Sequence, residues 1–142
     1  MAETINIDAT NLIVGRLASY AAKQALLGHT VNIFNCEKAV MSGDFKILRE
    51  RYYHRIFDVG RPFKGPYRSR MPDRFVRWMI RAMVAYKQQR GREAFERIMC
   101  YIGVPAKFAD AKLIKVGKDV SELPKLKYTT VGDLCVSIGG KV

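Results

Sequence analysis

Hydrophobic and polar positions at the start of the chain alternate in a pattern that predicts a strand, a helix and a second strand. Residues 4–7 alternate between polar and apolar side chains, the period of a half-buried strand. Residues 12–27 carry apolar side chains at helical spacing, and Gly28 follows where a helix commonly stops. Residues 31–35 read as a second strand. The whole forms a βαβ unit, which implies a parallel sheet with a right-handed crossover.

The middle of the chain predicts further helices. One begins after Ser42, a capping residue, and extends to about Tyr53. Another begins at Pro72, a residue that suits the first turn of a helix. Gly91 is expected to break this helix before a short one over residues 92–97.

The last third predicts a buried strand and a helical tail. Residues 98–102 are continuously apolar, as a buried parallel strand should be. Residues 106–127 are lysine-rich and weakly patterned. Thr130 and Asp133 then form a pair like a capping box, before a helix that ends at Gly139.

Periodicity is lost over residues 57–71, where glycines and prolines alternate with basic residues. Such a segment buries nothing by itself. Long loops without regular structure are uncommon inside compact domains and tend to be functional. We therefore expect an extended basic loop with a binding role.

Length and composition favour one globular domain over residues 1–142. The chain has 142 residues, of which 49% are hydrophobic, and no apolar run is long enough for a membrane span. Acidic residues at positions 3 and 8 argue against a secretory signal peptide. With 25 basic residues against 13 acidic ones, the net charge is +12, which is typical of proteins whose partner is a polyanion.

The positive charge is concentrated in residues 46–97, which hold 12 of the 13 arginines. This segment has 15 basic and five acidic residues, so it carries +10 of the net charge. Arginine grips phosphate with two parallel hydrogen bonds and stacks on bases. The preference for arginine over lysine therefore favours a nucleic-acid-binding segment over a merely soluble surface. Residues 106–142 are left as a C-terminal tail.

In the helix after Pro72, Arg74, Arg77 and Arg81 fall on one face, and apolar side chains fall on another. A solvated face would normally mix positive and negative charges, but this stripe has no acidic residue. We therefore expect a displayed row of guanidinium groups.

Aromatic residues are interleaved with the basic ones. Phe63 and Tyr67, inside the loop, are candidates for stacking on RNA bases. Core packing is the better interpretation for Tyr52 and Trp78.

Motifs for catalysis or cofactor binding are missing from the sequence. It contains no glycine-rich dinucleotide fingerprint and no phosphate-binding P-loop motif. Cys36, Cys100 and Cys135 are widely spaced and are expected to be reduced, buried thiols rather than metal ligands. We expect no enzyme activity, cofactor or metal. A nucleotide-dependent enzyme with a degenerate Rossmann-like half remains an alternative.

Several short motifs together resemble one known family. They are VGRLAS (14–19), LLG (26–28), VNIFNCEK (31–38), SG (42–43), RP (61–62), GP (65–66), RMP (70–72), K with RG (87, 90–91) and YIGVP (101–105). In this order and spacing they resemble the L-thirteen family of large-subunit ribosomal proteins. The tail around 128–141 is similar to archaeal or eukaryotic members rather than bacterial ones, and the modest length favours an archaeal member.

This resemblance implies a three-layer α/β/α fold with a four-stranded parallel sheet in the order 3-2-1-4. A long basic loop and a helical C-terminal tail complete it. It also implies a structural constituent of the large ribosomal subunit in the cytoplasm, with a role in assembly and translation. The implied partners are large-subunit ribosomal RNA and neighbouring ribosomal proteins, without a membrane or a small-molecule substrate. A regulator that binds messenger RNA or a protein away from the ribosome is a second alternative.

The expected RNA-binding residues come from three sources. Helix geometry adds Arg77 and Arg81, and the basic segment adds Arg55 and Tyr67. The positions that the resemblance implies are Arg16, Lys38, Arg61, Lys64, Arg68, Arg70, Arg74, Lys87, Arg90 and Arg92.

Two positions depart from the family pattern. Members often have a proline where this chain has Ala85, so we expect the long helix to continue to Lys87 without a kink. The tail often ends in Gly-Trp, whereas this chain has Gly139-Gly140.

Overall fold

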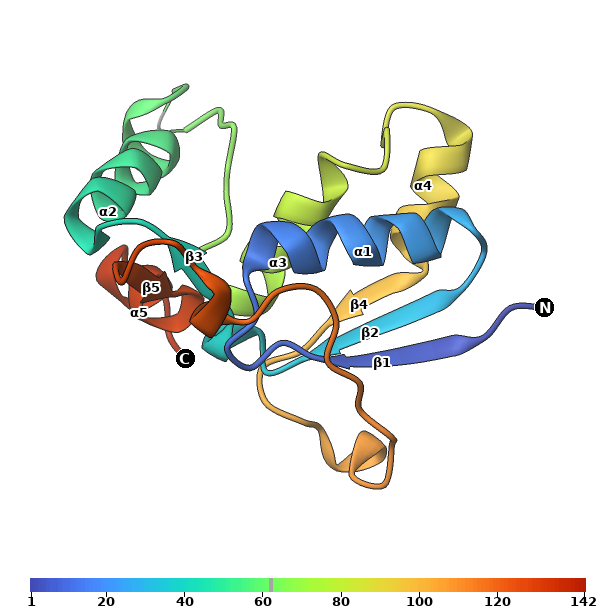
Figure 1. The fold of residues 1–142 in the computed structure, drawn as a ribbon. Helices are drawn as coiled ribbons and strands as arrows, with labels where there is room; N and C mark the ends of the chain where they lie inside the picture. Colours follow the sequence, from blue (N-terminus) through green and yellow to red (C-terminus); the bar gives the residue numbers. More distant parts are fainter. Residues whose placement is uncertain (62) are drawn as a thin grey trace.

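The computed structural model describes residues 1–61 and 63–142 (Figure 1). The predicted βαβ unit is confirmed as β1 (Thr4–Asp8), α1 (Val14–Leu26) and β2 (Thr30–Phe34). The two strands pair in parallel, from Thr4 opposite Thr30 to Asp8 opposite Phe34. The apolar strand predicted after residue 97 is β4 (Ile98–Cys100), which ends two residues earlier than expected and pairs in parallel with β2.

The remaining elements lie after β2 in the chain. They are β3 (Val40–Ser42), α2 (Phe45–Tyr53), α3 (Pro72–Arg81), α4 (Gln89–Glu96), β5 (Tyr128–Thr130), α5 (Val131–Ser137), and the short turns η1 (Cys36–Lys38), η2 (His54–Asp58), η3 (Ala106–Phe108) and η4 (Val120–Glu122).

One layer of helices covers the parallel sheet. Helix α1 contacts both α3 and α4, and Figure 1 shows all three on the same side of the strands. The side chains beneath them, such as Ile7, Ile33 and Ile98, are completely buried. The opposite face carries Asn6 and Asn32, which hydrogen-bond to each other over 3.0 Å.

The predicted third layer is therefore wrong for the part of the chain that the structure describes. The opposite face is covered only in part, since Asn32 and Phe34 are buried there whereas Met99 is 42% exposed. The segment after β4, with the short turn η3, lies on that side (Figure 1). There, Phe34 stacks on Tyr101 and contacts Phe108, with ring centres 5.3 and 5.1 Å apart.

The parallel sheet has three strands in the order β1-β2-β4, rather than the predicted four. Ile114 lies where a fourth strand would be, as an isolated parallel bridge to Ile7. Two backbone bonds of 2.9 Å hold it against β1, one from the Asp8 amide and one to the Asn6 carbonyl. Nearby, Gly117 adopts φ +84°, a left-handed conformation that does not continue a strand.

A second, smaller unit lies beyond one end of the parallel sheet (Figure 1). It consists of the antiparallel pair β3 and β5 with helices α2 and α5. The predicted cap of α5 is confirmed, because the Asp133 amide donates to the Thr130 hydroxyl over 3.2 Å. Helix α2 is capped by Asp44 rather than by the predicted Ser42.

The continuous helix expected up to Lys87 is wrong. Helix α3 ends at Arg81, and Ala85 adopts the left-handed φ of +50° in the turn that follows. Gly91 does not break a helix but lies buried within α4. A Cβ atom there would lie 2.0 Å from the Val84 carbonyl oxygen, so only glycine permits this close approach of turn and helix.

The three cysteines are free and buried, as predicted. Burial raises the pKa of the Cys135 thiol to about 12, which keeps it protonated. Within residues 1–61 and 63–142, no helix is long and apolar enough to cross a membrane.

Candidate nucleic-acid interface

The basic loop leads from α2 to α3 and displays its charged side chains. The last turn of α2 widens into the π-helical turn η2 before the loop begins. Arg61 and Gly65 form a short bridge, with the Arg61 amide donating to the Gly65 carbonyl over 3.0 Å. Lys64 is exposed, and so is Tyr67, at 74%. Pro62, part of the predicted loop, lies outside the described residues.

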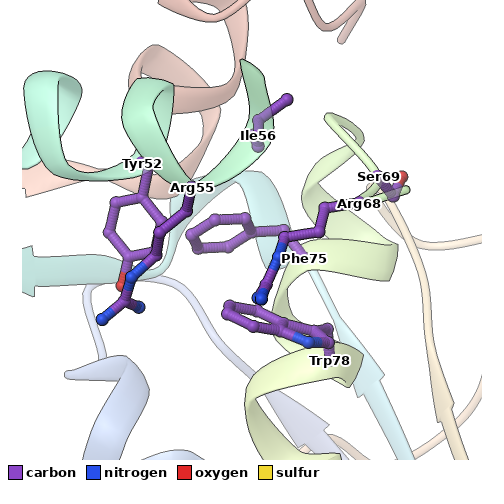
Figure 2. A pocket seen from close by; sticks show the side chains of 7 residues that line it. All are labelled: Tyr52, Arg55, Ile56, Arg68, Ser69, Phe75 and Trp78. Atoms are coloured by element: carbon purple, nitrogen blue, oxygen red, sulfur yellow. The ribbon is translucent and has the colours of Figure 1, made fainter. Parts of the chain in front are cut away.

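The loop returns to the body of the protein at Arg68. Its guanidinium carbon lies 4.6 Å from the centre of the Trp78 ring, a cation–π contact. Figure 2 shows this pair in a small cleft, with Arg55 beside Tyr52 on the other side. The Nε atom of Arg68 is buried and has no hydrogen-bond partner among the described residues.

The three arginines of α3 have different environments. Arg74 is exposed, and the Arg81 guanidinium lies 4.0 Å from the centre of the Tyr86 ring. Arg77 instead donates through Nε to the carbonyl of Ile98 over 3.0 Å and stacks on Phe95. The prediction that all three are displayed is therefore wrong for Arg77, because the start of β4 lies beside it and offers a free carbonyl.

The basic side chains around Trp78 form one continuous surface. Trp78 lines three neighbouring hollows, and each of them is also lined by basic residues. The set that the structure brings together, which we name the Trp78 surface, is Trp78 with Arg55, Arg68, Arg74, Arg77, Arg81 and Lys87.

Four of the five arginines of this surface, all except Arg74, lie over aromatic rings and not beside carboxylates. In the described part of the chain the ion pairs are His54 with Asp58 and Lys127 with Asp44. Neither pair involves a predicted RNA-binding residue. Stacking on a ring orients a guanidinium without neutralising it. The positive charge of the Trp78 surface is therefore uncompensated.

Arg70 joins the loop to the C-terminal tail. Its guanidinium lies 4.5 Å from the centre of the Phe57 ring, next to the loop. A Cβ atom on Gly140 would lie 2.2 Å from the Arg70 carbonyl oxygen. The Gly139-Gly140 pair, a departure from the family pattern, thus permits the tail to lie directly against the start of α3.

The remaining predicted residues lie outside the Trp78 surface. Arg90 lines a separate hollow between α4 and α1, and Arg92 donates to the Tyr86 carbonyl over 3.4 Å. Arg16 and Lys38 are exposed on α1 and η1. Among the described residues, neither lines a hollow that Trp78 shares.

Sequence reasoning missed the part played by three aromatic residues. Trp78 packs against the edge of the core, as expected, but it is only half-buried and also supports the Arg68 guanidinium. Tyr86 and Phe95 contact each other edge to face and support Arg81 and Arg77. Among the contacts between an arginine and a ring on this surface, only that of Arg55 with Tyr52 follows from helical spacing. In the others, the arginine and the ring come from different elements.

The carboxyl ends of the strands, where a doubly wound fold binds nucleotides, are occupied by the chain itself. The Ile13 amide donates to the Lys118 carbonyl over 3.0 Å, and the Asn11 carbonyl accepts from Val120 over 2.9 Å. Asp8 is partly buried there, which raises its pKa, but hydrogen bonds from Asn35 and Thr10 outweigh this effect and lower it. The described residues contain no cluster of three or more potential metal ligands.

Comparison with known proteins decides the family. The model of the family described as ribosomal protein L13 matches residues 2–107. The chain belongs to this family. Large ribosomal subunit protein uL13 of Methanococcoides burtonii is 41% identical over 136 residues, which cover 95% of this chain and 97% of the relative.

Other members of the family match over a similar extent. The protein of the same name from Methanopyrus kandleri is 40% identical, covering 94% of this chain and 85% of the relative. The protein of the same name from Haloarcula marismortui is 37% identical, and the match covers 94% of this chain and 89% of the relative. The family resemblance predicted from the short motifs is confirmed.

Proposed function

We propose that this protein is a structural constituent of the large ribosomal subunit that binds ribosomal RNA and has no enzyme activity. The interface would consist of the Trp78 surface and the described part of the basic loop, residues 57–61 and 63–71. The uncompensated charge of the arginines carries this proposal. Apart from Arg77, which donates to backbone carbonyls, these guanidinium groups lack carboxylate partners and remain available to phosphate. The relatives named above are all large-subunit proteins, which supports the same assignment.

Binding of this kind depends on charge and shape more than on sequence. Each basic side chain that contacts a phosphate releases counterions from the RNA, which favours association at low salt. Phosphate contacts position a protein but do not read bases, so selectivity would come from RNA shape and from unpaired nucleotides. The α/β body would act as a rigid scaffold that holds the loop and α3 where RNA segments converge.

The proposed setting follows from the family. As a ribosomal protein, this chain would act in the cytoplasm, with ribosomal RNA and neighbouring ribosomal proteins as partners, in subunit assembly and translation. The exposed residues outside the Trp78 surface, Arg16, Lys38, Arg90 and Arg92, would contact further RNA segments or neighbouring proteins.

A charge-neutralised variant tests the interface. The triple variant Arg74→Gln, Arg81→Gln and Lys87→Gln removes three of the four exposed charges of the Trp78 surface and leaves Arg55 in place. The matched control replaces three exposed tail lysines, Lys107, Lys112 and Lys125, with glutamine. Binding to large-subunit ribosomal RNA fragments is measured against salt concentration.

We expect the triple variant to bind more weakly and with a shallower dependence on salt. Each lost phosphate contact should reduce the slope of log K against log salt by roughly 0.7 to 0.9, so by roughly 2 to 3 for the triple variant. The tail control should change the slope less. Equal slopes in the two variants would show that the charge of the Trp78 surface has no special role. Failure of the unmodified protein to co-sediment with large subunits would contradict the ribosomal assignment itself.

A further inference from the structure

Two of the hollows beside Trp78 combine aromatic and basic side chains in a way that phosphate binding alone does not require. Both are lined by Trp78, Arg81 and Tyr86. Lys87 and Gln88 add to one of them, and the arginines of α3 add to the other. Within the described residues, no carboxylate lines either hollow.

The aromatic platform is held in place by a chain of contacts. The Tyr86 and Phe95 rings meet at 85° with their centres 5.4 Å apart. Arg81 lies 4.0 Å above Tyr86, and its side chain is exposed, so the guanidinium plane extends the stack toward solvent. A planar group can continue such a stack, because guanidinium planes and aromatic rings both stack on nucleic-acid bases.

The turn after α3 brings polar side chains to the rim. Ala85 adopts φ +50°, which is uncommon for a residue with a side chain and occurs preferentially at binding sites. The Gln88 amide closes this turn by donating to the Ala85 carbonyl over 3.0 Å. Lys87 and Gln88 therefore lie beside the aromatic platform. A glutamine side chain can both donate and accept hydrogen bonds at the edge of a base.

We infer that the hollow whose rim carries Lys87 and Gln88 binds a single unpaired RNA base. The base stacks on the guanidinium of Arg81 beside the Trp78 indole. Arg74 and Lys87 contact the phosphates on either side of that nucleotide. The inference rests on the proposed function and adds to it a preference for looped or bulged RNA. Bases inside a duplex are stacked on their neighbours and cannot enter the hollow.

The single tryptophan of the chain provides a direct probe, because all tryptophan fluorescence comes from Trp78. The full-length protein is titrated with a hairpin RNA whose loop is unpaired, and with a blunt RNA duplex of the same length. We expect the hairpin to quench Trp78 fluorescence and to bind about tenfold more tightly than the duplex. Equal affinities, with no quenching specific to the hairpin, would overturn the inference and leave the proposed function intact. If neither RNA binds, the proposed function fails as well.

The variant Arg81→Lys separates stacking from charge. Lysine keeps the positive charge but lacks the planar group, so the preference for the hairpin should fall by about tenfold. The salt dependence and the melting temperature should not change, since Arg81 is exposed. The control Arg49→Lys makes the same replacement at an exposed position of α2 and should behave like the unmodified protein. A hairpin preference that survives in Arg81→Lys would overturn the stacking site.

Discussion

Arg74 and Arg77 lie on the same helix, three residues apart, but they serve different purposes. Arg77 donates two hydrogen bonds to backbone carbonyls, of Ile98 at 3.0 Å and of Phe95 at 3.4 Å. Arg74 is exposed and lines a hollow on the proposed RNA-binding surface. One arginine therefore joins α3 to β4, while the other is free to contact phosphate.

The variants Arg77→Gln and Arg74→Gln should separate stability from binding. Hydrogen bonds from charged groups contribute about 1.5–3 kcal/mol, so Arg77→Gln should lower the free energy of unfolding by an amount of that order. Arg74→Gln should change it by less than about 0.5 kcal/mol and should weaken RNA binding. Urea denaturation and RNA titration of both variants measure the two effects. An Arg77→Gln variant as stable as the unmodified protein would contradict the structural role.

At the scale of elements, the contact between α4 and the turn after α3 determines where Lys87 and Gln88 lie. Gly91 makes this contact possible, since it lies buried against the carbonyls of Val84 and Ala85. Without a side chain at this position, the two backbones can come close together. The same turn places Tyr86 under Arg81. Gly91, a residue that acts only through packing, therefore supports the proposed interface.

Gly91→Ala should destabilise the protein strongly. The added Cβ atom would lie 2.0 Å from one carbonyl oxygen and 2.2 Å from another, and overpacking of this kind costs about 1–3 kcal/mol or more. Gly15→Ala is the matched control, because a Cβ atom on Gly15 in α1 meets nothing within 4 Å. The control should be neutral or more stable by up to about 1 kcal/mol. Thermal unfolding of both variants tests the pair, and similar losses in the two would exclude the close contact as the cause.

On the scale of the whole molecule, charge opposes folding and favours binding. The net charge is +12, and most of it belongs to one segment whose arginines have no carboxylate partners within the described residues. Like charges held close together repel one another in the compact state, and salt screens this repulsion. RNA neutralises the same charges directly. Folding and RNA binding should therefore respond to salt in opposite directions.

Added salt should raise the melting temperature of the free protein while it weakens RNA binding. If screening of this repulsion raises the free energy of unfolding by about 1 kcal/mol, the melting temperature should rise by roughly 2–4 °C. Thermal unfolding between low and moderate concentrations of sodium chloride measures this shift, with the charge-neutralised triple variant as the control. The triple variant should respond less. A fall in melting temperature with salt would mean that attractive pairs outweigh the repulsion.

Features that depend on neighbours in the chain could be predicted from the sequence. The βαβ unit, the cap at Thr130, the buried cysteines and the family follow from periodicity, local residue preferences and ordered motifs. The extended basic loop also follows, because its glycines and prolines prevent regular structure locally. The concentration of charge in residues 46–97 is a property of composition and needs no structure.

Features that depend on contacts between distant residues were decided only by the tertiary structure. Arg77 is structural because β4, twenty-one residues later, places a carbonyl beside it. The local pattern predicts that Gly91 breaks a helix, because its close contact with the preceding turn has no signature in that pattern. The gathering of Arg68, Trp78 and Arg81 on one surface likewise depends on how the loop returns to α3. Sequence periodicity reports which side chains share a face of one element, whereas packing determines which elements that face meets.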